Sequence, residues 1–147
     1  MSLSEKEILQ YKEIRKVYCP YFNQEINFNS KGLTHIKFNG QGKARTGADQ
    51  KFRIKHIKYA KIILEKSHTL QGMLMQNKQE RIRALGVTEY KEKKISFYEF
   101  IAVVEDKRLK VIVKQIENGD KYFWSIIPFW KKILEGRKLH SINIEEI

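Results

Sequence analysis

The chain has 147 residues, of which 41% are hydrophobic and 12% aromatic, so it has the size and apolar content of one folded domain rather than of a disordered chain. Lys and Arg total 29 against 17 Asp and Glu, which gives a formal net charge of +12. Such an excess favours a polyanionic partner over a basic surface kept for solubility, with nucleic acid ahead of an anionic membrane surface.

The number of cysteines and the length of the apolar runs indicate in which cellular compartment the protein is expected. Cys19 is the only cysteine, so the chain cannot form an internal disulfide or a cysteine zinc site. No signal-peptide pattern opens the chain, and no apolar run approaches the roughly 20 residues of a membrane-spanning helix. We therefore expect a protein of the reducing cytoplasm that does not associate with membranes.

The chain opens with a helix signal. Ser4 and Glu7 have the spacing of a capping box, which predicts a helix over residues 4–16. Pro20 prevents that helix from continuing. Alternating apolar residues then favour an extended segment over 21–28.

Two further helices are expected before the middle of the chain. Asn29 or Ser30 can cap a short helix over 31–38. A loop with three glycines and two cations follows over 39–47. A longer basic helix is predicted over 48–66.

The two sides of this longer helix differ. Its polar side carries Lys51, Lys55, Lys58 and Lys61, of which the first three are candidates for contacting nucleic acid. Arg53 and His56 instead fall within the apolar side, three positions apart. Either this pair forms a functional constellation at a sheet, or the helix breaks near Ile57 and the anomaly disappears.

The C-terminal half predicts an antiparallel β-meander. Asn118-Gly119 is a strong signal for a type I′ hairpin turn, because both central residues of that turn need positive φ. For the stretch before Gly86, the sequence pattern fits either a strand or a helix. The expected elements are a strand over 69–75 or a helix over 76–85, strands over 95–105, 108–117 and 120–127, a helix over 129–137 and a mobile tail over 139–147. The order predicts an α+β fold with N-terminal helices packed on a C-terminal antiparallel meander, in one domain over 1–147 with its core at about 19–131.

Several kinds of chemistry lack their motifs. The sequence has no phosphate-binding loop of the GxxxxGK[ST] type and no GxGxxG. Its four histidines lack metal-ligand spacing, and Asp49 is the only acid among nine cations between residues 31 and 61. We therefore expect neither a metal nor a cofactor.

The residue types for metal-independent RNA cleavage gather around the glycine loop. Such cleavage needs a base for the 2′-OH proton, an acid for the leaving oxygen and cations for the phosphate charge. His35 can serve as acid or base, while Lys37, Lys43 and Arg45 supply charge. A surface helix followed by a solvated basic loop is an equally good interpretation of this segment.

Lys114 and Ser125 are a further candidate pair on neighbouring strands of the meander. Pairing around the Asn118-Gly119 turn places Lys114 opposite Phe123 and diagonal to Ser125. A lysine with isoleucines on the same face suits the edge of a site, although snorkelling explains it as well. A nearby aromatic cluster can stack unpaired bases or simply cover the core; it consists of Tyr122, Trp124, Phe129 and Trp130.

Seven runs between about residues 19 and 131 resemble an uncharacterised bacterial and phage-associated family. They are FNSKGLTHI at 28–36, KAR at 43–45, ADQ at 48–50, KSHTLQG at 66–72, YEFIAV at 98–103, KVIVKQI at 110–116 and KYFWSIIP at 121–128. This layout is similar to the metal-independent ribonuclease superfamily of barnase, EndoU, tRNA-cutting colicins and RelE-type toxins. The resemblance implies catalytic roles for His35, Arg45 and Ser125, but the catalytic glutamate of the barnase pattern has no counterpart.

Three functions follow as hypotheses. The first is a metal-independent endoribonuclease of toxin or phage-associated type, in which His35 acts as acid or base, Arg45, Lys37 and Lys114 hold the phosphate, and Ser125 positions it. The second is a non-catalytic module that binds nucleic acid, RNA rather than DNA, through the same basic surface. The third is an interaction protein that docks an acidic partner such as an antitoxin.

Overall fold

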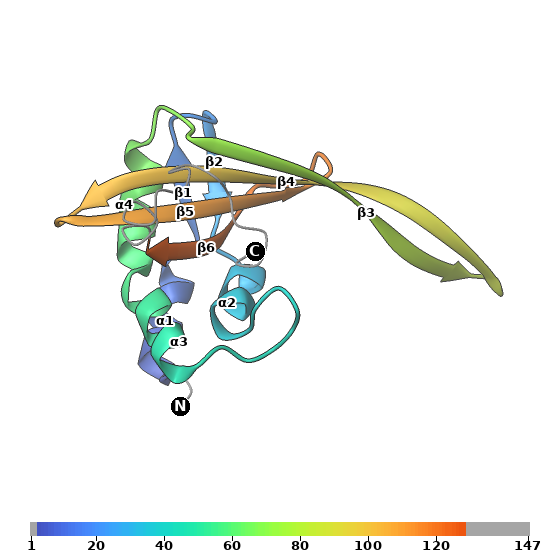
Figure 1. Cartoon of the computed structure of the whole chain (residues 1–147), viewed down its shortest axis with the longest axis horizontal. Helices are drawn as coiled ribbons and strands as arrows, with labels where there is room; N and C mark the ends of the chain where they lie inside the picture. The colour runs from blue at the N-terminus through green and yellow to red at the C-terminus, as the bar shows by residue number, and fades with distance from the viewer. Residues whose placement is uncertain (1–2, 129–147) are drawn as a thin grey trace, which may run out of the picture.

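The computed structural model describes residues 3–128 and has an α+β architecture, in which helices come first and a sheet follows (Figure 1). The helices are α1 (Glu5–Ile14), α2 (Ser30–Lys37), α3 (Gly47–Lys55) and α4 (Ile57–Lys66). The strands are β1 (Lys16–Cys19), β2 (Gln24–Asn27), β3 (Gly72–Ala84), β4 (Val87–Val104), β5 (Lys107–Ile116) and β6 (Tyr122–Pro128). The predicted fold class is therefore confirmed.

The strands form one mixed sheet in the order β1-β2-β6-β5-β4-β3. Strands β3 to β6 make an antiparallel meander, and β1 pairs antiparallel with β2. Between β2 and β6 the only paired residues are Asn27 and Tyr122, which run parallel. A single residue pair therefore joins the β1–β2 hairpin to the rest of the sheet. Helix α2 packs against β6.

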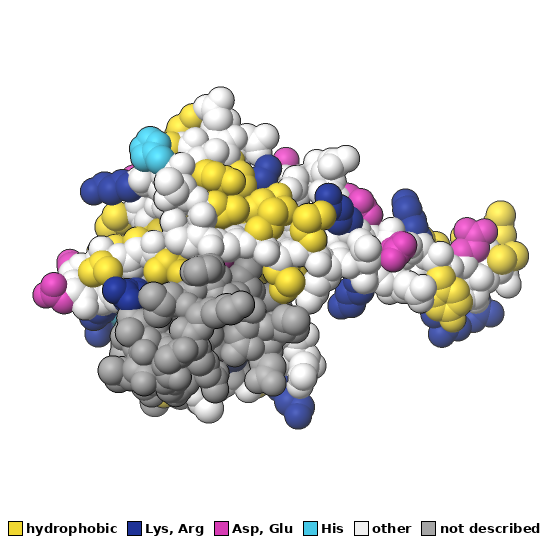
Figure 2. Space-filling model, turned by 45° about the horizontal axis from the view of Figure 1, so that its top comes forward, with side chains coloured by type: hydrophobic (Ala, Val, Ile, Leu, Met, Phe, Trp, Pro, Cys, Tyr) yellow, Lys and Arg dark blue, Asp and Glu magenta, His cyan; other side chains and the backbone are white. Residues whose placement is uncertain are grey.

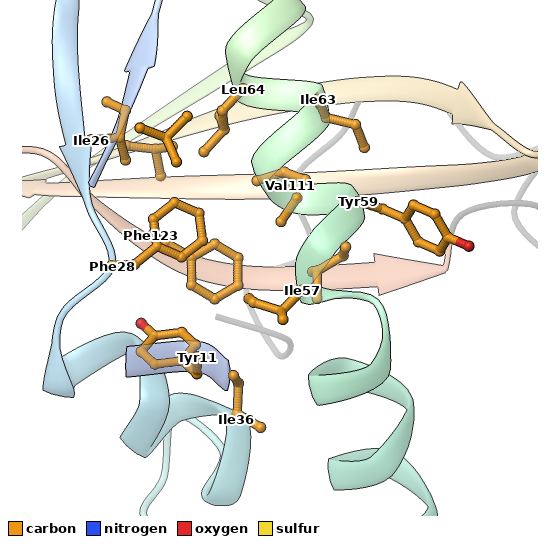
Figure 3. Close-up of a cluster of buried hydrophobic side chains, with 14 of the residues drawn as sticks. Tyr11, Ile26, Phe28, Ile36, Ile57, Tyr59, Ile63, Leu64, Val111 and Phe123 are labelled. Atoms are coloured by element: carbon orange, nitrogen blue, oxygen red, sulfur yellow. The ribbon is translucent and has the colours of Figure 1, made fainter. Parts of the chain in front are cut away.

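The core lies where the helices meet the sheet (Figure 3). The rings of Phe28 and Phe123 stack at 4.9 Å, and Tyr11 of α1 packs against both. The Tyr11 hydroxyl donates a hydrogen bond to the Asn29 carbonyl at 2.7 Å, just before α2 begins. The first helix thus fixes the start of the second through a buried contact.

Gly32 allows α2 to lie close to the sheet. A Cβ atom at this position would lie 2.6 Å from the Phe123 carbonyl oxygen and would also meet the Tyr11 hydroxyl. Real Cβ contacts are never that short, so any larger residue must push α2 away from β6. The next turn of the same helix carries His35, so this close approach also determines where His35 lies.

A long two-stranded arm projects from the sheet (Figure 1). Strand β5 pairs with β4 only from Ile95 onward, whereas β3 and β4 continue to pair with each other out to the turn at Leu85 and Gly86. We call residues 78–93 the arm. All of them except Lys93 are exposed.

The first half of the chain follows the prediction with two differences. The capping box of Ser4 and Glu7 is present, and Asn29 caps α2. The predicted helix over 48–66 breaks at His56, whose φ of −94° and ψ of 3° end α3 and start α4. A short strand over 16–19 was not predicted, because four residues with two buried positions carry too weak a pattern.

The second half differs more. The alternative of a helix over 76–85 is wrong, since β3 runs through this segment, and β4 begins at Val87 rather than near residue 95. The type I′ turn predicted at Asn118-Gly119 is wrong, because neither residue has positive φ, and Lys114 therefore pairs with Tyr122 rather than with Phe123. A β-bulge then restores the predicted register from the pair of Ile112 and Ser125 onward. The helix predicted over 129–137, the tail over 139–147, Phe129 and Trp130 lie outside the described residues. Within residues 3–128, no helix is long and apolar enough to cross a membrane.

Candidate functional site

A pocket of about 600 Å³ lies between α2, the glycine loop and the sheet. It is lined from α2 by Lys31, Thr34, His35 and Phe38, from the loop by Asn39, Gly40 and Gly42, and from the sheet by Gln76, Lys78, Ile95, Phe97, Lys114 and Trp124. Three of these side chains are lysines, and none of the described lining residues is acidic. The pocket therefore has the charge of an anion-binding site.

His35 lies at the wall of this pocket in a tightly defined environment. Its side chain is only 3% exposed, and its ring stacks on Trp124 with centroids 4.0 Å apart. Arg45 donates from Nε to the His35 carbonyl at 2.8 Å, and its Nη2 lies 3.1 Å from Nε2 of the ring. A guanidinium can only donate, so Nε2 accepts and the imidazole is neutral with its proton on Nδ1.

Arg45 belongs to a network that joins the loop, α3 and β6. Asp49 binds Arg45 Nη1 through one carboxylate oxygen at 3.4 Å and Arg53 Nε through the other at 2.9 Å. Arg53 then donates from Nη1 to the hydroxyl of Ser125 at 2.6 Å, where both side chains are buried. The residues predicted at 45, 53 and 125 thus come together, with Asp49 as the linking carboxylate.

Lys114 faces the pocket from β5 across the same indole. Its Nζ atom lies 3.8 Å from the centroid of the Trp124 ring and 5.4 Å from that of Phe97. Burial, with the nearby charges of Lys78 and Lys31, lowers the pKa of Lys114 to about 8. At neutral pH this lysine is mostly charged, yet it can give up its proton far more easily than an ordinary lysine.

Trp124 therefore connects the two titratable groups of the pocket. His35 stacks on it from α2, and Lys114 makes a cation–π contact with it from β5. Trp124 lies at the bulge of β6, between the register pairs formed by Phe123 and Ser125. The indole that lines the pocket thus comes from the bulged position of β6.

The residues expected to contact nucleic acid separate into three groups. Lys37 at the end of α2 and Lys43 in the loop follow or precede lining residues in the chain but do not line the pocket themselves, and they are half-exposed and exposed respectively. Arg53 is buried in the network described above. Lys51, Lys55 and Lys58 are not brought to the pocket at all.

These three lysines line a separate groove of about 580 Å³ between α1 and the α3–α4 pair. The groove also contains Glu7, Glu13 and Lys61. Lys51 forms an ion pair with Glu7 at 2.5 Å, and this hydrogen bond lowers the pKa of Glu7. Part of the positive charge is thus neutralised within the groove.

His56 is a buried joint between helices rather than a pocket residue. Its Nδ1 donates to the Phe52 carbonyl at 2.7 Å, which leaves Nε2 to accept from Lys107 at 3.3 Å. Burial lowers the pKa of His56, and the charge of Lys107 lowers it further. The alternative of a helix break, rather than a functional pair with Arg53, describes this residue.

Sequence reasoning missed five polar residues of the pocket: Lys31, Thr34, Asn39, Gln76 and Lys78. Lys31 could have been found, since it lies four residues before His35 and thus on the same helical face. Lys78 could not, because its segment was left open between strand and helix. Asn39 shapes the loop by accepting hydrogen bonds from the backbone of Gln41 and Lys43.

Comparison with known proteins adds no identification. No family model, no curated protein and no solved structure matches the chain. The resemblance to metal-independent ribonucleases therefore depends on the seven sequence runs between residues 28 and 128 alone. Within the described part of the chain, no three His, Cys, Asp or Glu side chains are grouped as a metal ion would need.

Proposed function

We propose that this protein binds RNA in the pocket beside α2 and cleaves it there as a metal-independent endoribonuclease of the toxin or phage-associated type. The observation that carries the proposal is the set of three lysines around His35 and Trp124 in a pocket with no acid among its described lining residues. Phosphates neutralise such a cluster, and the exposed ring of Phe38 offers a surface on which an unpaired base can stack.

The two titratable groups suit opposite halves of the reaction. His35 is neutral, so its Nε2 can accept the 2′-OH proton once Arg45 turns to the phosphate. The 2′-oxygen then attacks phosphorus, and the bond from phosphorus to the 5′-oxygen breaks. Lys114, with a pKa of about 8, supplies the proton to that leaving oxygen, so the products are a 2′,3′-cyclic phosphate and a 5′-hydroxyl.

The second candidate is a non-catalytic RNA-binding module. It is favoured by the burial of His35, whose contacts with Arg45 and Trp124 also suit a purely structural role. An interaction with an acidic protein, the third hypothesis, would use the lysines of the groove between α1 and the α3–α4 pair.

Incubation with labelled total tRNA and a single-stranded RNA in EDTA separates the first two functions. The purified wild type is compared with His35→Ala, Lys114→Met and the matched control His68→Ala, which changes an exposed histidine that does not line the pocket. We expect discrete cleavage by the wild type and the control, and none by the two pocket variants. Thermal unfolding checks that each variant is folded.

Two results would contradict the catalytic proposal. One is a salt-sensitive gel shift without cleavage that is the same for all four proteins. This result would favour the non-catalytic RNA-binding module. The other is cleavage that survives in both pocket variants, because the reacting groups would then lie elsewhere.

A further inference from the structure

We propose that RNA held in the pocket continues along one face of the β3–β4 arm, so that the substrate is a strand long enough to occupy both surfaces. This inference rests on the proposed function, because it takes RNA as the occupant of the pocket. It adds a second binding surface, 78–93, which no motif of the sequence indicated.

The register of the two strands places one face of the arm next to the pocket. Directly opposed residues of an antiparallel pair point to the same side of the ribbon, and this side alternates along each strand. Phe97 pairs with Leu74, Ile95 with Gln76, and Lys93 with Lys78. Four of these six residues line the pocket, namely Phe97, Ile95, Gln76 and Lys78, so this face leads directly out of it.

The same face continues with positive charge. Lys91 lies two residues beyond Lys93 on β4 and therefore points to the same side. Together with Lys78 and the pocket's Lys114, these side chains form a cationic track from the pocket onto the arm. From the row of Phe97 to Lys91 it spans six residue steps, or about 20 Å at roughly 3.3 Å per residue.

The track carries more like charge than the protein itself compensates. Lys78 and Lys93 stand directly opposite each other, an arrangement that is destabilising between like charges. Glu80 stands opposite Lys91 and binds Lys93 at 2.5 Å, and Glu89 lies next along the same face, so two carboxylates stand against the four lysines of the track. A bound phosphate chain would relieve this repulsion, whereas an apolar or basic partner would not.

The arm is too exposed to contribute much to the hydrophobic core, which fits a role in binding. Residues 78–92 are all exposed, and Figure 2 shows charged side chains of both signs along the arm with hydrophobic ones at its far end. Such a ribbon buries little apolar surface of its own. The exposed tip residues Leu85 and Val87 make self-association through the tip the competing occupant, which the experiment below measures directly.

The test compares two double variants that remove the same charge from opposite faces. Lys91→Gln with Lys93→Gln changes the pocket-side face, and Arg81→Gln with Arg83→Gln changes the other face of the same strands. The probes are fluorescent 2′-O-methyl RNAs of about 4 and about 20 nucleotides, which bracket short and extended single-strand sites and lack the attacking hydroxyl. Affinity is measured by anisotropy across a salt series.

We expect the pocket-side variant to bind the long RNA about tenfold more weakly, with a salt slope smaller by about 1.4 for two lost phosphate contacts. Its affinity for the short RNA should equal that of the wild type, and the opposite-face variant should lose less than about twofold on either probe. Glu80→Gln, which releases Lys93, should strengthen binding of the long RNA.

The outcomes distinguish this inference from the proposal on which it rests. A wild type that binds neither RNA overturns the proposed function itself. A wild type that binds both, with equal losses in the two double variants, overturns only the role of the arm. Sedimentation that shows dimers of the wild type, lost in Leu85→Ser without any change in RNA affinity, would instead assign the arm to contacts between copies.

Discussion

In the described part of the chain, two hollows of nearly equal size are each lined by three or more lysines, and their chemistry differs. The groove between α1 and the α3–α4 pair contains four lysines, but two glutamates line it as well, and Glu7 binds Lys51. The pocket beside α2 contains fewer lysines and no acid among its described lining residues. One of its lysines, Lys114, lies directly over the indole of Trp124. The number of cations therefore does not separate the two surfaces.

The difference lies in how the positive charge is compensated and how far it is desolvated. In the groove, exposed lysines are balanced by solvent and by neighbouring carboxylates, which is how most basic surfaces are arranged. In the pocket, Lys114 gives up part of its hydration, and burial depresses its pKa. A pocket that contains a partly desolvated lysine with a lowered pKa is a stronger candidate for ligand chemistry than a surface whose lysines stay solvated.

Removing one lysine from each hollow should separate them most clearly. We expect Lys114→Met to reduce RNA cleavage about 10²- to 10³-fold, because the variant loses a proton donor and a cation beside the phosphate. Lys58→Met, in the groove, should change it less than about twofold, as expected for a solvated charge. Initial cleavage rates measure both, and equal losses would remove the distinction between the hollows.

Two cations on α3 should differ in stability rather than in binding. Arg53 connects Asp49 to the buried hydroxyl of Ser125, so Arg53→Gln should lower the free energy of unfolding by about 3 kcal/mol. Lys55→Gln, two residues away and exposed, should stay within about 0.5 kcal/mol of the wild type. Urea denaturation provides the comparison, and a small effect at Arg53 would contradict the network.

The depressed pKa of Lys114 predicts a pH signature. Between its folded pKa of about 8 and the ordinary value of 10.5, the unfolded chain binds more protons, so this group makes stability rise with pH. Lys114→Met should therefore be more stable than the wild type at pH 7, by about 1 kcal/mol after solvent screening of a partly buried side chain.

That advantage should shrink between pH 8 and pH 10, where denaturation curves can be compared. Above pH 10 the raised pKa of Tyr122, about 12, lowers the stability of both proteins alike. Parallel pH profiles of the two proteins would show that Lys114 does not have the depressed pKa.

The smallest effect is expected from breaking the ion pair between Lys51 and Glu7 in the groove. Glu7→Gln removes the carboxylate that binds Lys51 and should strengthen RNA binding at most about twofold, with little change of salt slope, because the groove lies outside the proposed binding surface. Anisotropy with the long RNA measures it. A gain as large as that of Glu80→Gln would mean that the groove also contacts RNA.

The fold was predictable where local signals and burial agree. The capping box and the Asn29 cap each specify one local geometry, and both are present. Asn118-Gly119 lies between β5 and β6 as predicted but does not form a type I′ turn, because Glu117 is the residue with positive φ there. The arm was not predictable, because both of its faces are solvated and the alternation of polar and apolar residues that identifies strands is therefore missing. The break at His56 was indicated only by the two basic residues on the apolar side of the predicted helix, which left it as one of two alternatives, since one residue outside helical geometry hardly disturbs the apolar periodicity.

The candidate site was predictable in residue types but not in contacts. His35 and Arg45 are close in sequence, and both were identified from the same segment. The contact between Arg53 and Ser125 spans 72 positions, and the link through Asp49 depends on the angle between α3 and the sheet. Lys114 was chosen for its strand position, but its contact with Trp124 depends on a bulge that no local pattern specifies.

Trp124 gives the pocket an optical reporter of its own. The chain has two tryptophans, and the second, Trp130, lies outside the described residues. The emission of an indole depends on the charges and water around its ring, and here those are set by an imidazole and an ammonium group in direct contact. In a Trp130→Phe background, the fluorescence of a single native side chain would therefore follow protonation and occupancy of the pocket without any attached dye.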